Sequence, residues 1–497
     1  MAAEAVRAWR CVVCGFVHQG PEAPDACPVC GATRDEFEPC REETPRVTAP
    51  RVGRWRCVDC GYVHAGTAPP DECPACGALA DRFEPVMEAP ANAAGAAGPV
   101  KVIVVGAGIA GVTAVESLRA ASPEAEVTLI SQEVHLPYYR LNLTRFLAGE
   151  ITEDRLAIHP ESWYEQQGVR LLRGRSVAGM DLDLHVVVLD DGEQLPFDSV
   201  VLAAGAHPAV PPIPGLNRDN ALSVRTIDDA KEILSRVRRG MQCVCIGGGI
   251  LGLETAGALA RRGAEVAVIE NCGWLLPRQL NERAGRVLER AVMGMGIRMR
   301  FRSRTAEILG DRCAQGVRLD DGTTVPADLV ILATGIRPDV NLAQRAGLTV
   351  NRGVLVDDRL ATSHPNVWAA GDVAEHRGVV NGLWMAAQAQ GSIAGLNALG
   401  HGLLFGGLPP SNVLKVLGVD LFSIGVVEPE GAGIRVIDEE TDDKYYRLVF
   451  RDARLVGAIF VGDTGHAVAA RKAIESAIDL TRILRQGAGV ADILAGA

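Results

Sequence analysis

The sequence has no excess of positive charge, no long apolar run and no secretory signal at its N-terminus. Its 497 residues carry a formal net charge of −11, which does not favour a nucleic-acid partner. The longest apolar stretch, near residues 100–115, contains three glycines and is too short to cross a bilayer. The first residues, MAAEAVRAWRC, lack the apolar core of a signal peptide. We therefore expect a cytoplasmic protein that binds neither nucleic acid nor membrane.

The composition is that of a globular protein, with 48% hydrophobic and 22% charged residues. The length is sufficient for three or four domains. The charge is unevenly spread, because residues 1–90 carry 14 acidic and 9 basic side chains. The front of the chain is therefore predicted to be a compact acidic unit.

Eight of the thirteen cysteines lie in C-x-x-C pairs, which favours metal ligation in a reducing cytoplasm over disulfides. The stretch CVVCGFVHQGPEAPDACPVCG (11–31) recurs 46 positions later as CVDCGYVHAGTAPPDECPACG (57–77). Each unit is too small to fold on hydrophobic burial alone, so a metal staple is expected. The predicted ligands are Cys11, Cys14, Cys27 and Cys30 in the first unit, and Cys57, Cys60, Cys73 and Cys76 in the second.

Other residues near these pairs are not predicted to bind metal. His18 and His64 each follow a cysteine by four positions, but four thiolates already complete a tetrahedron, so we expect both to pack or to form hydrogen bonds. Cys243 and Cys245 alternate on an apolar strand and are expected in a core. The sequence assigns no role to Cys40, Cys272 or Cys313.

Two segments have the strand, glycine turn, helix and strand order of a nucleotide-binding βαβ unit: residues 101–131 and 242–270. Each contains G-x-G-x-x-G, and such glycines let a pyrophosphate approach a helix N-terminus. The predicted cofactor-binding glycines are Gly106, Gly108 and Gly111 in the first segment, and Gly247, Gly249 and Gly252 in the second.

The residue that ends the second strand indicates the nucleotide. Glu270 is placed to accept the adenosine ribose hydroxyls, and no arginine follows it to bind a 2′-phosphate, which favours NAD over NADP. At the first site the corresponding position is Ser131, with Glu133 two residues further on, and the sequence does not decide between them.

These patterns predict an α/β protein with two Rossmann-like domains and a small α+β C-terminal domain, preceded by two metal-stapled modules. In the last domain we expect a hairpin over 444–462 and a helix over 466–485. The expected boundaries are 1–40 and 53–86 for the modules, 87–99 for a linker, 100–225 and 326–402 for the first Rossmann-like domain, 226–325 for the second, NAD-binding one and 403–497 for the C-terminal domain.

Three further segments, in order around the two glycine motifs, carry a family resemblance: VLAAGAHPAVPPIPG (201–215), ILATGIRPD (331–339) and TSHPNVWAAGDVAE (362–375). Over residues 100 to about 400 the chain resembles the FAD-dependent pyridine-nucleotide oxidoreductases. The resemblance implies that Asp372 binds the flavin ribitol region and that Glu254 lies beside the nicotinamide–flavin contact. It also places Gly335 at the cofactor, and a helix that starts near Asn381 at the flavin pyrimidine edge.

The route by which electrons leave the flavin divides this family. Disulfide reductases carry a cysteine soon after the first glycines, but no cysteine occurs between Cys76 and Cys243. The segment HLPYYRLNLTRFLAGE instead resembles rubredoxin reductases and the flavin half of assimilatory nitrite reductases, which places Arg140 near the flavin. SNVLKVLGVDLFSIG (411–425) also resembles the last domain of rubredoxin reductases. Glu254 and Arg140 are thus the catalytic candidates.

The paired cysteines themselves are shared by zinc ribbons and rubredoxins, since four thiolates suit zinc and iron alike. They resemble the short rubredoxin-like modules of rubrerythrins, although the twelve-residue spacing departs from that of free-standing rubredoxins. A flavoprotein without an exit cysteine needs a one-electron acceptor, which favours two Fe(Cys)₄ centres.

The resulting prediction is an NADH:rubredoxin oxidoreductase that passes single electrons from FAD to its own modules and on to an unknown acceptor protein. The alternatives are an NADH oxidase, or a nitrite-reductase-like flavin half whose modules are zinc ribbons for protein docking. The C-terminal domain could form a homodimer.

Overall fold

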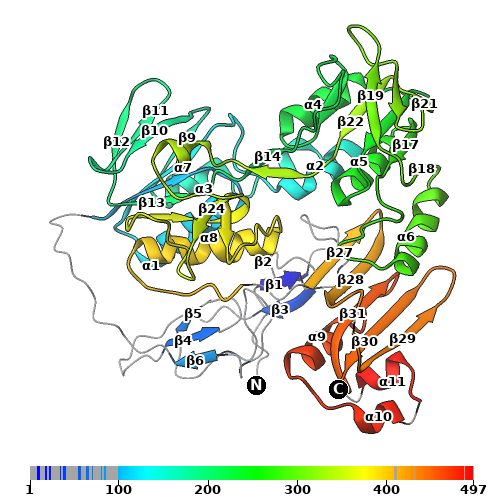
Figure 1. Cartoon of the computed structure of the whole chain (residues 1–497). Helices are drawn as coiled ribbons and strands as arrows, with labels where there is room; N and C mark the ends of the chain where they lie inside the picture. The colour runs from blue at the N-terminus through cyan, green and yellow to red at the C-terminus, as the bar shows by residue number, and fades with distance from the viewer. Residues whose placement is uncertain are drawn as a thin grey trace. The chain divides into compact units, whose positions relative to one another are not determined.

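The computed structural model describes residues 8–11, 17–19, 22–23, 34, 37–40, 54–57, 63–65, 70, 80, 83–85, 99–407, 411–429, 431–485 and 487–495 (Figure 1). The chain divides into two compact units. The first comprises 1–142, 152–207 and 336–408, and the second comprises 143–151, 208–335 and 409–497.

Each of the two cysteine-rich segments forms its own small antiparallel sheet, and the two sheets have the same strand arrangement. In the first, β1 (Ala8–Cys11) lies between β2 (Val17–Gln19) and β3 (Phe37–Cys40). In the second, β4 (Arg54–Cys57) lies between β5 (Val63–Ala65) and β6 (Phe83–Pro85). The register is also repeated, because Trp9 pairs with His18 and Trp55 with His64. The sequence repeat is therefore a repeat of structure.

The first unit is built on a five-stranded parallel sheet with the order β25-β13-β7-β8-β9. The central strand is almost fully buried, as expected for a parallel sheet covered on both faces. The strands are β7 (Lys101–Val105), β8 (Glu126–Ser131), β9 (Val169–Arg173), β13 (Ser199–Leu202) and β25 (Val367–Ala369).

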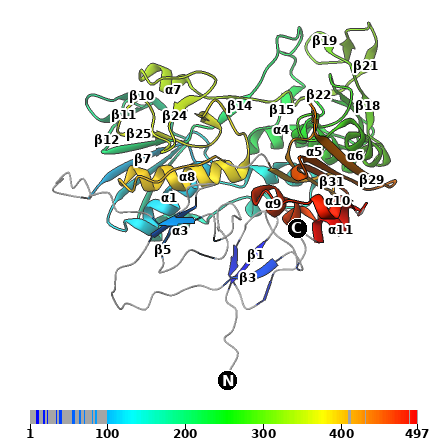
Figure 2. The ribbon, with the colours of Figure 1, turned by 60° about the horizontal axis from the view of Figure 1, so that its bottom comes forward.

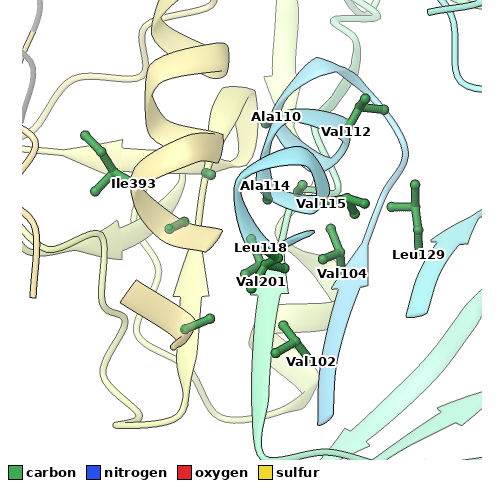
Figure 3. Packing of buried hydrophobic residues seen from close by; sticks show 14 of the residues in the cluster. Val102, Val104, Ala110, Val112, Ala114, Val115, Leu118, Leu129, Val201 and Ile393 are labelled. Atoms are coloured by element: carbon green, nitrogen blue, oxygen red, sulfur yellow. The ribbon is translucent and has the colours of Figure 1, made fainter. Parts of the chain in front are cut away.

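Two helices, α1 (Ile109–Ala121) and α8 (Trp384–Ala398), lie side by side over this sheet (Figure 3). Small residues allow this close approach, since a Cβ on Gly391 would lie 2.2 Å from the carbonyl oxygen of Ala110. Val104, Leu118 and Val201 are fully buried between α1 and the strands. The helix expected near Asn381 begins at Trp384.

Shorter elements complete the first unit. A three-stranded antiparallel sheet has the order β10-β11-β12, β14 pairs with β23, and β24 pairs with β26. Their bounds, with those of the remaining helices, are β10 (Val177–Asp181), β11 (Val186–Leu189), β12 (Gln194–Pro196), β14 (Ala206–Pro208), β23 (Ile336–Pro338), β24 (Val354–Val356), β26 (Ala374–His376), α3 (Glu161–Gln166) and α7 (Asn341–Arg345).

The second unit contains a second five-stranded parallel sheet, in the order β15-β22-β16-β17-β18. A three-stranded antiparallel sheet, β19-β20-β21, belongs to the same unit. The bounds are β15 (Ala221–Ser223), β16 (Gln242–Ile246), β17 (Glu265–Ile269), β18 (Arg298–Arg300), β19 (Thr305–Leu309), β20 (Gly316–Leu319), β21 (Thr324–Pro326), β22 (Leu329–Leu332), α2 (Leu143–Ala148), α4 (Ile227–Arg236), α5 (Ile250–Arg261) and α6 (Glu282–Gly294).

The C-terminal domain is a five-stranded antiparallel sheet, β27-β28-β31-β30-β29, with helices α9, α10 and α11 against it (Figure 2). The bounds are β27 (Ser411–Val416), β28 (Val419–Gly425), β29 (Ile434–Glu440), β30 (Tyr445–Arg451), β31 (Arg454–Val461), α9 (Ala467–Glu475), α10 (Thr481–Arg485) and α11 (Val490–Ala495).

The prediction of one helix over 466–485 is wrong, whereas the predicted hairpin is confirmed as β30 and β31. The helix breaks after α9 because Ala477 has a φ of +46°. The chain then returns to the sheet, where the Leu480 N–H bonds the Ala453 carbonyl, and Asp479 caps the start of α10 through the Thr481 N–H.

Among the described helices, none combines the length and the hydropathy that a membrane span requires.

Candidate cofactor sites

The first glycine motif forms a tight turn between β7 and α1. Gly106 has a φ of +104°, and a Cβ there would lie 2.2 Å from the Ala203 carbonyl oxygen. A Cβ on Gly111 would lie 1.9 Å from the Gly106 carbonyl oxygen, so this glycine permits the helix to pack on the turn. Gly108, the N-cap of α1, faces open space, with no atom within 4 Å of a Cβ. Two glycines thus build the turn, and the third leaves room for a phosphate group at the helix N-terminus.

The second motif repeats this geometry between β16 and α5. Gly247 has a φ of +111°, and a Cβ there would lie 2.4 Å from the Ala333 carbonyl oxygen. A Cβ on Gly252 would lie 2.0 Å from the Gly247 carbonyl oxygen, and Gly249 again faces open space. Both turns therefore fit the pyrophosphate of a dinucleotide.

Glu270 closes the second turn. Its carboxylate accepts the backbone N–H of Gly248 at 2.8 Å and that of Cys272 at 2.7 Å. The loop after Glu270 is also held by a residue that sequence inspection missed: Arg302 donates its N–H to the Cys272 carbonyl, and its guanidinium lies against Gly273. An arginine therefore lies against the loop that follows this acid, although none follows the acid directly in sequence.

Arg140 lies in a group of charged residues at the end of β8. Its guanidinium donates to Glu133 at 2.7 Å and to the Tyr138 hydroxyl at 2.8 Å, and that hydroxyl donates to the second Glu133 oxygen at 2.7 Å. Burial would lower the pKa of Arg140, but Tyr138, Glu133 and Asp372 together raise it above its ordinary value, so the guanidinium stays charged. Three residues predicted separately for the flavin site, Arg140, Glu133 and Asp372, therefore interact.

Ser131 is buried at the end of β8, where its hydroxyl donates to the Glu133 carbonyl at 3.1 Å. Both Glu133 carboxylate oxygens are already bonded to Tyr138 and Arg140. Which of the two residues would hold an adenosine ribose stays a prediction.

Asp372 lies in a 3₁₀ turn over Gly371–Val373, directly before β26. The turn is tied to α8, because the Gly371 N–H donates to the Gln390 side-chain oxygen at 2.8 Å. The Gln390 amide nitrogen is buried without a hydrogen-bond partner. A buried donor left unsatisfied beside Asp372 is compatible with a polar ligand there. At the start of α8, the ring centroids of Trp384 and Tyr139 lie 5.6 Å apart.

Glu254 lies on α5, two residues after the last glycine of the second motif. Its carboxylate oxygen Oε1 accepts the backbone N–H of Leu417 at 2.7 Å. Burial raises the pKa of Glu254, and the Leu417 N–H opposes this effect. Gly335, with a φ of +104°, follows β22, and its carbonyl accepts the Ala209 N–H at 2.9 Å.

Four cysteines beyond the N-terminal segments, Cys243, Cys245, Cys272 and Cys313, are free thiols. Cys243 and Cys245 are buried in β16, and burial raises the pKa of Cys243 to about 12. Burial and Glu270 raise the pKa of Cys272, which makes it a poor nucleophile. Cys313 is exposed.

The predicted metal ligands cannot be placed in the same way. Cys11 and Cys57 end β1 and β4, where only their backbone is described. The other predicted ligands, Cys14, Cys27, Cys30, Cys60, Cys73 and Cys76, lie outside the described residues.

The sequence matches three family models. Residues 100–391 match the pyridine nucleotide-disulphide oxidoreductase model, which covers more than half of the chain. Residues 410–478 match the C-terminal domain of rubredoxin NAD⁺ reductase. Residues 9–38 and 55–84 each match the rubredoxin-like domain of rubrerythrin.

Individual relatives agree with these models. A nitrite reductase [NAD(P)H] of Bacillus subtilis is 35% identical over 74% of this chain and 46% of its own length. An NADH-rubredoxin oxidoreductase of Clostridium acetobutylicum is 29% identical over 76% of this chain and 94% of its own length. The chain thus spans about half of the nitrite reductase but nearly all of the rubredoxin oxidoreductase.

A solved structure, the covalent putidaredoxin reductase–putidaredoxin complex, superposes with a TM-score of 0.70 and 25% identity over 80% of this chain and 99% of that one. FAD and NADH are the cofactors of the matched family, and rubredoxin-like domains bind iron. The chain belongs to the pyridine nucleotide-disulphide oxidoreductase family and is a flavoprotein of the rubredoxin reductase type with two rubredoxin-like domains at its N-terminus.

Proposed function

We propose that this enzyme moves electrons from NADH through FAD to its own two rubredoxin-like domains, and from them to an external acceptor protein in the cytoplasm. The observation that carries the proposal is a combination within one chain. Two rubredoxin-like domains precede the flavoprotein, and no cysteine for a thiol relay occurs between Cys76 and Cys243. Bound FAD accepts a hydride and releases electrons one at a time, whereas an iron held by four thiolates accepts one electron.

Each predicted residue has a defined task in this proposal. Gly108 and Gly249 leave space for the two pyrophosphates, and Glu270 accepts the ribose hydroxyls of NADH. Glu254 contacts the nicotinamide side of the site. Glu133 orients Arg140, since both of its carboxylate oxygens are bonded to the Arg140–Tyr138 pair. Asp372, beside Arg140, receives the flavin ribitol.

The duplication matches the stoichiometry of the reaction. One hydride carries two electrons, and two single-electron centres can take both. Residues 87–99 are rich in alanine, glycine and proline and would act as a tether that keeps the domains near the flavin at high effective concentration. Acidic domains would then recognise basic surfaces on the flavoprotein and on the acceptor.

The competing function is a flavoprotein whose cysteine clusters hold zinc and serve only for docking. Metal analysis and an absorption spectrum separate the two, because zinc thiolates have no visible absorption. We expect iron, with the flavin band bleaching first under anaerobic NADH and the iron–thiolate bands following. A colourless N-terminal part, or iron bands that NADH never bleaches, would favour the docking function.

Removal of residues 1–95 tests the path itself. We expect the shortened enzyme to reduce small artificial acceptors at the normal rate but to lose transfer to its acceptor protein. If transfer to that protein is unchanged, the rubredoxin-like domains are not on the electron path.

A further inference from the structure

The tip of the β27–β28 hairpin has a buried leucine, Leu417, at a turn position with a positive φ. Val416 and Val419 form the last pair of the ladder, so Leu417 and Gly418 are the two turn residues. Both have a positive φ, +52° and +85°, as a tight two-residue turn requires. Asparagine or glycine is the usual first residue of such a turn, and a leucine there is disfavoured by its Cβ. Leu417 is nevertheless 3% exposed, whereas hairpin tips normally face solvent.

The buried tip contacts one helix, α5, in two ways. The Leu417 backbone N–H donates to the Glu254 carboxylate at 2.7 Å. The Leu417 side chain fills the space over Gly257, where a Cβ would lie 2.0 Å from its Cδ2 and would meet no other residue as closely. Glu254 and Gly257 are three positions apart and therefore share a helix face. The backbone and the side chain of Leu417 thus both contact the face of α5 that carries Glu254 and Gly257.

The second Glu254 oxygen, Oε2, accepts no hydrogen bond from any part of the chain that the structure describes. The charged groups that act on this carboxylate are Arg261, on the same helix, and Glu150, which follows α2. Glu150 is itself bonded to Arg261 at 2.6 Å and to Arg145 at 3.2 Å. The Leu417 N–H is therefore the direct partner that fixes the orientation of Glu254.

We propose that Leu417 is a positioning residue for nicotinamide binding: its N–H holds one oxygen of Glu254, so that the other is presented to the nicotinamide group of NADH. This inference rests on the role proposed for Glu254. It makes the C-terminal domain a structural part of the nucleotide site and explains why a leucine occupies a turn position that suits glycine.

The substitution Gly257→Leu tests this proposal while Glu254 and both turn residues keep their identity. A side chain at Gly257 occupies the space of Leu417 and pushes the turn away from α5. Gly294→Leu is the matched control, because Gly294 ends α6 with no atom within 4 Å of a Cβ. The double variant Gly257→Leu with Leu417→Gly restores the total side-chain volume between the helix and the turn. It keeps the backbone N–H of residue 417 and puts a glycine where φ is positive.

Three measurements are compared among these variants: hydrogen exchange of the turn amide, KM against kcat for NADH in flavin reduction, and the pH profile of kcat/KM. For Gly257→Leu we expect exchange to accelerate at least about tenfold, KM to rise about fivefold or more, and the acidic limb to move to higher pH. The pH shift follows because a lost N–H donor disfavours the ionised carboxylate. We expect Gly294→Leu and the exchanged pair to stay within about twofold of the parent.

Faster exchange in Gly257→Leu with an unchanged KM and pH profile would overturn the proposal. If exchange stays slow, Leu417→Pro takes the place of Gly257→Leu: proline has no N–H and cannot adopt the positive φ, so the turn must leave Glu254. Unchanged kinetics in that variant would overturn the proposal equally. Glu254→Ala and Glu254→Gln test the role proposed for Glu254 separately from the role proposed for Leu417. Normal NADH kinetics in Glu254→Ala would remove the role of Glu254 itself, whereas Glu254→Gln should keep the turn amide protected and lose the acidic limb.

Discussion

The carboxylate of Glu270 accepts the backbone N–H of Gly248 at 2.8 Å, which joins the acid after β17 to the glycine turn that opens α5. A second bond, from the Cys272 N–H, occupies the other oxygen. An acid held at both oxygens cannot swing away from an incoming phosphate. The adenosine end of the site is therefore built to reject negative charge.

We expect kcat/KM for NADH to exceed that for NADPH by at least about tenfold, on the order of 1.4 kcal/mol. In Glu270→Ala this ratio should fall, because the carboxylate that repels a 2′-phosphate is gone and Arg302, which lies against Gly273, can meet that phosphate instead. Steady-state kinetics with both nucleotides measure the effect. Adding Arg302→Gln should abolish the gain with NADPH; if it does not, Arg302 does not face the ribose.

The two Rossmann turns could be predicted from the sequence because their glycines form a motif inside one strand–turn–helix segment. Gly111 meets the Gly106 carbonyl of its own turn, and although Gly106 also meets Ala203 far along the chain, its spacing from Gly108 and Gly111 marks it in the sequence. Arg302 and Leu417 could not be predicted in this way. Each contacts a segment far away in the sequence, and no motif marks either contact. The break at Ala477 was missed because a helical pattern continues through it, whereas contacts with the sheet decide the backbone.

A bulky residue at Gly108 should prevent flavin binding without unfolding the protein. Gly108→Val places its side chain in the open space before α1, where the pyrophosphate is expected. We expect purified protein without the flavin spectrum, with normal iron content in the N-terminal domains. Gly179→Val, also in open space but on β10, is the control and should retain flavin. Loss of iron together with flavin would contradict independent folding of the domains.

Gly106→Ala should behave differently from Gly108→Val. The positive φ costs about 1–2 kcal/mol for a residue with a Cβ, and a Cβ 2.2 Å from the Ala203 carbonyl forces the turn apart. We expect a lower melting temperature even in protein stripped of flavin. An unchanged melting temperature would mean that the turn tolerates a side chain.

The Arg140–Glu133 pair should support flavin binding through charge rather than bulk. Arg140→Met leaves the Glu133 carboxylate, only 23% exposed, without its cation. We expect the Kd for FAD to rise roughly tenfold, about 1.4 kcal/mol, as measured by flavin fluorescence during reconstitution. Tyr138→Phe keeps the ion pair and should change the Kd by less than about threefold. Equal effects of the two variants would assign the role to packing.

Asp358 should stabilise the first unit in a pH-dependent way. Hydrogen bonds from Arg377 and His376 lower the pKa of Asp358 to about 2. Because the folded-state pKa lies below the unfolded value of about 3.9, the stabilisation is present above pH 4 and is lost as pH falls toward 2. The melting-temperature difference between the parent and Asp358→Asn should therefore be largest near neutral pH and shrink on acidification. Asp183→Asn, on the β10–β11 turn, is the control for removing one carboxylate charge at another position.

The duplicated cysteine clusters provide the sharpest test of the electron path. Replacing Cys57 and Cys60 by serine removes two thiolate ligands from the second domain, so iron should fall from two ions to one per chain. The N-terminal part should then take up one electron less in an anaerobic NADH titration, while the rate of flavin reduction by NADH stays near its normal value. The same pair of changes at Cys11 and Cys14 should give the same stoichiometry if the domains act as equivalent acceptors. Cys40→Ser, outside the C-x-x-C pairs, is the matched control and should keep both irons. If losing one iron leaves the electron count unchanged, the clusters do not store the electrons of the hydride, and a docking role becomes the better explanation of the repeat.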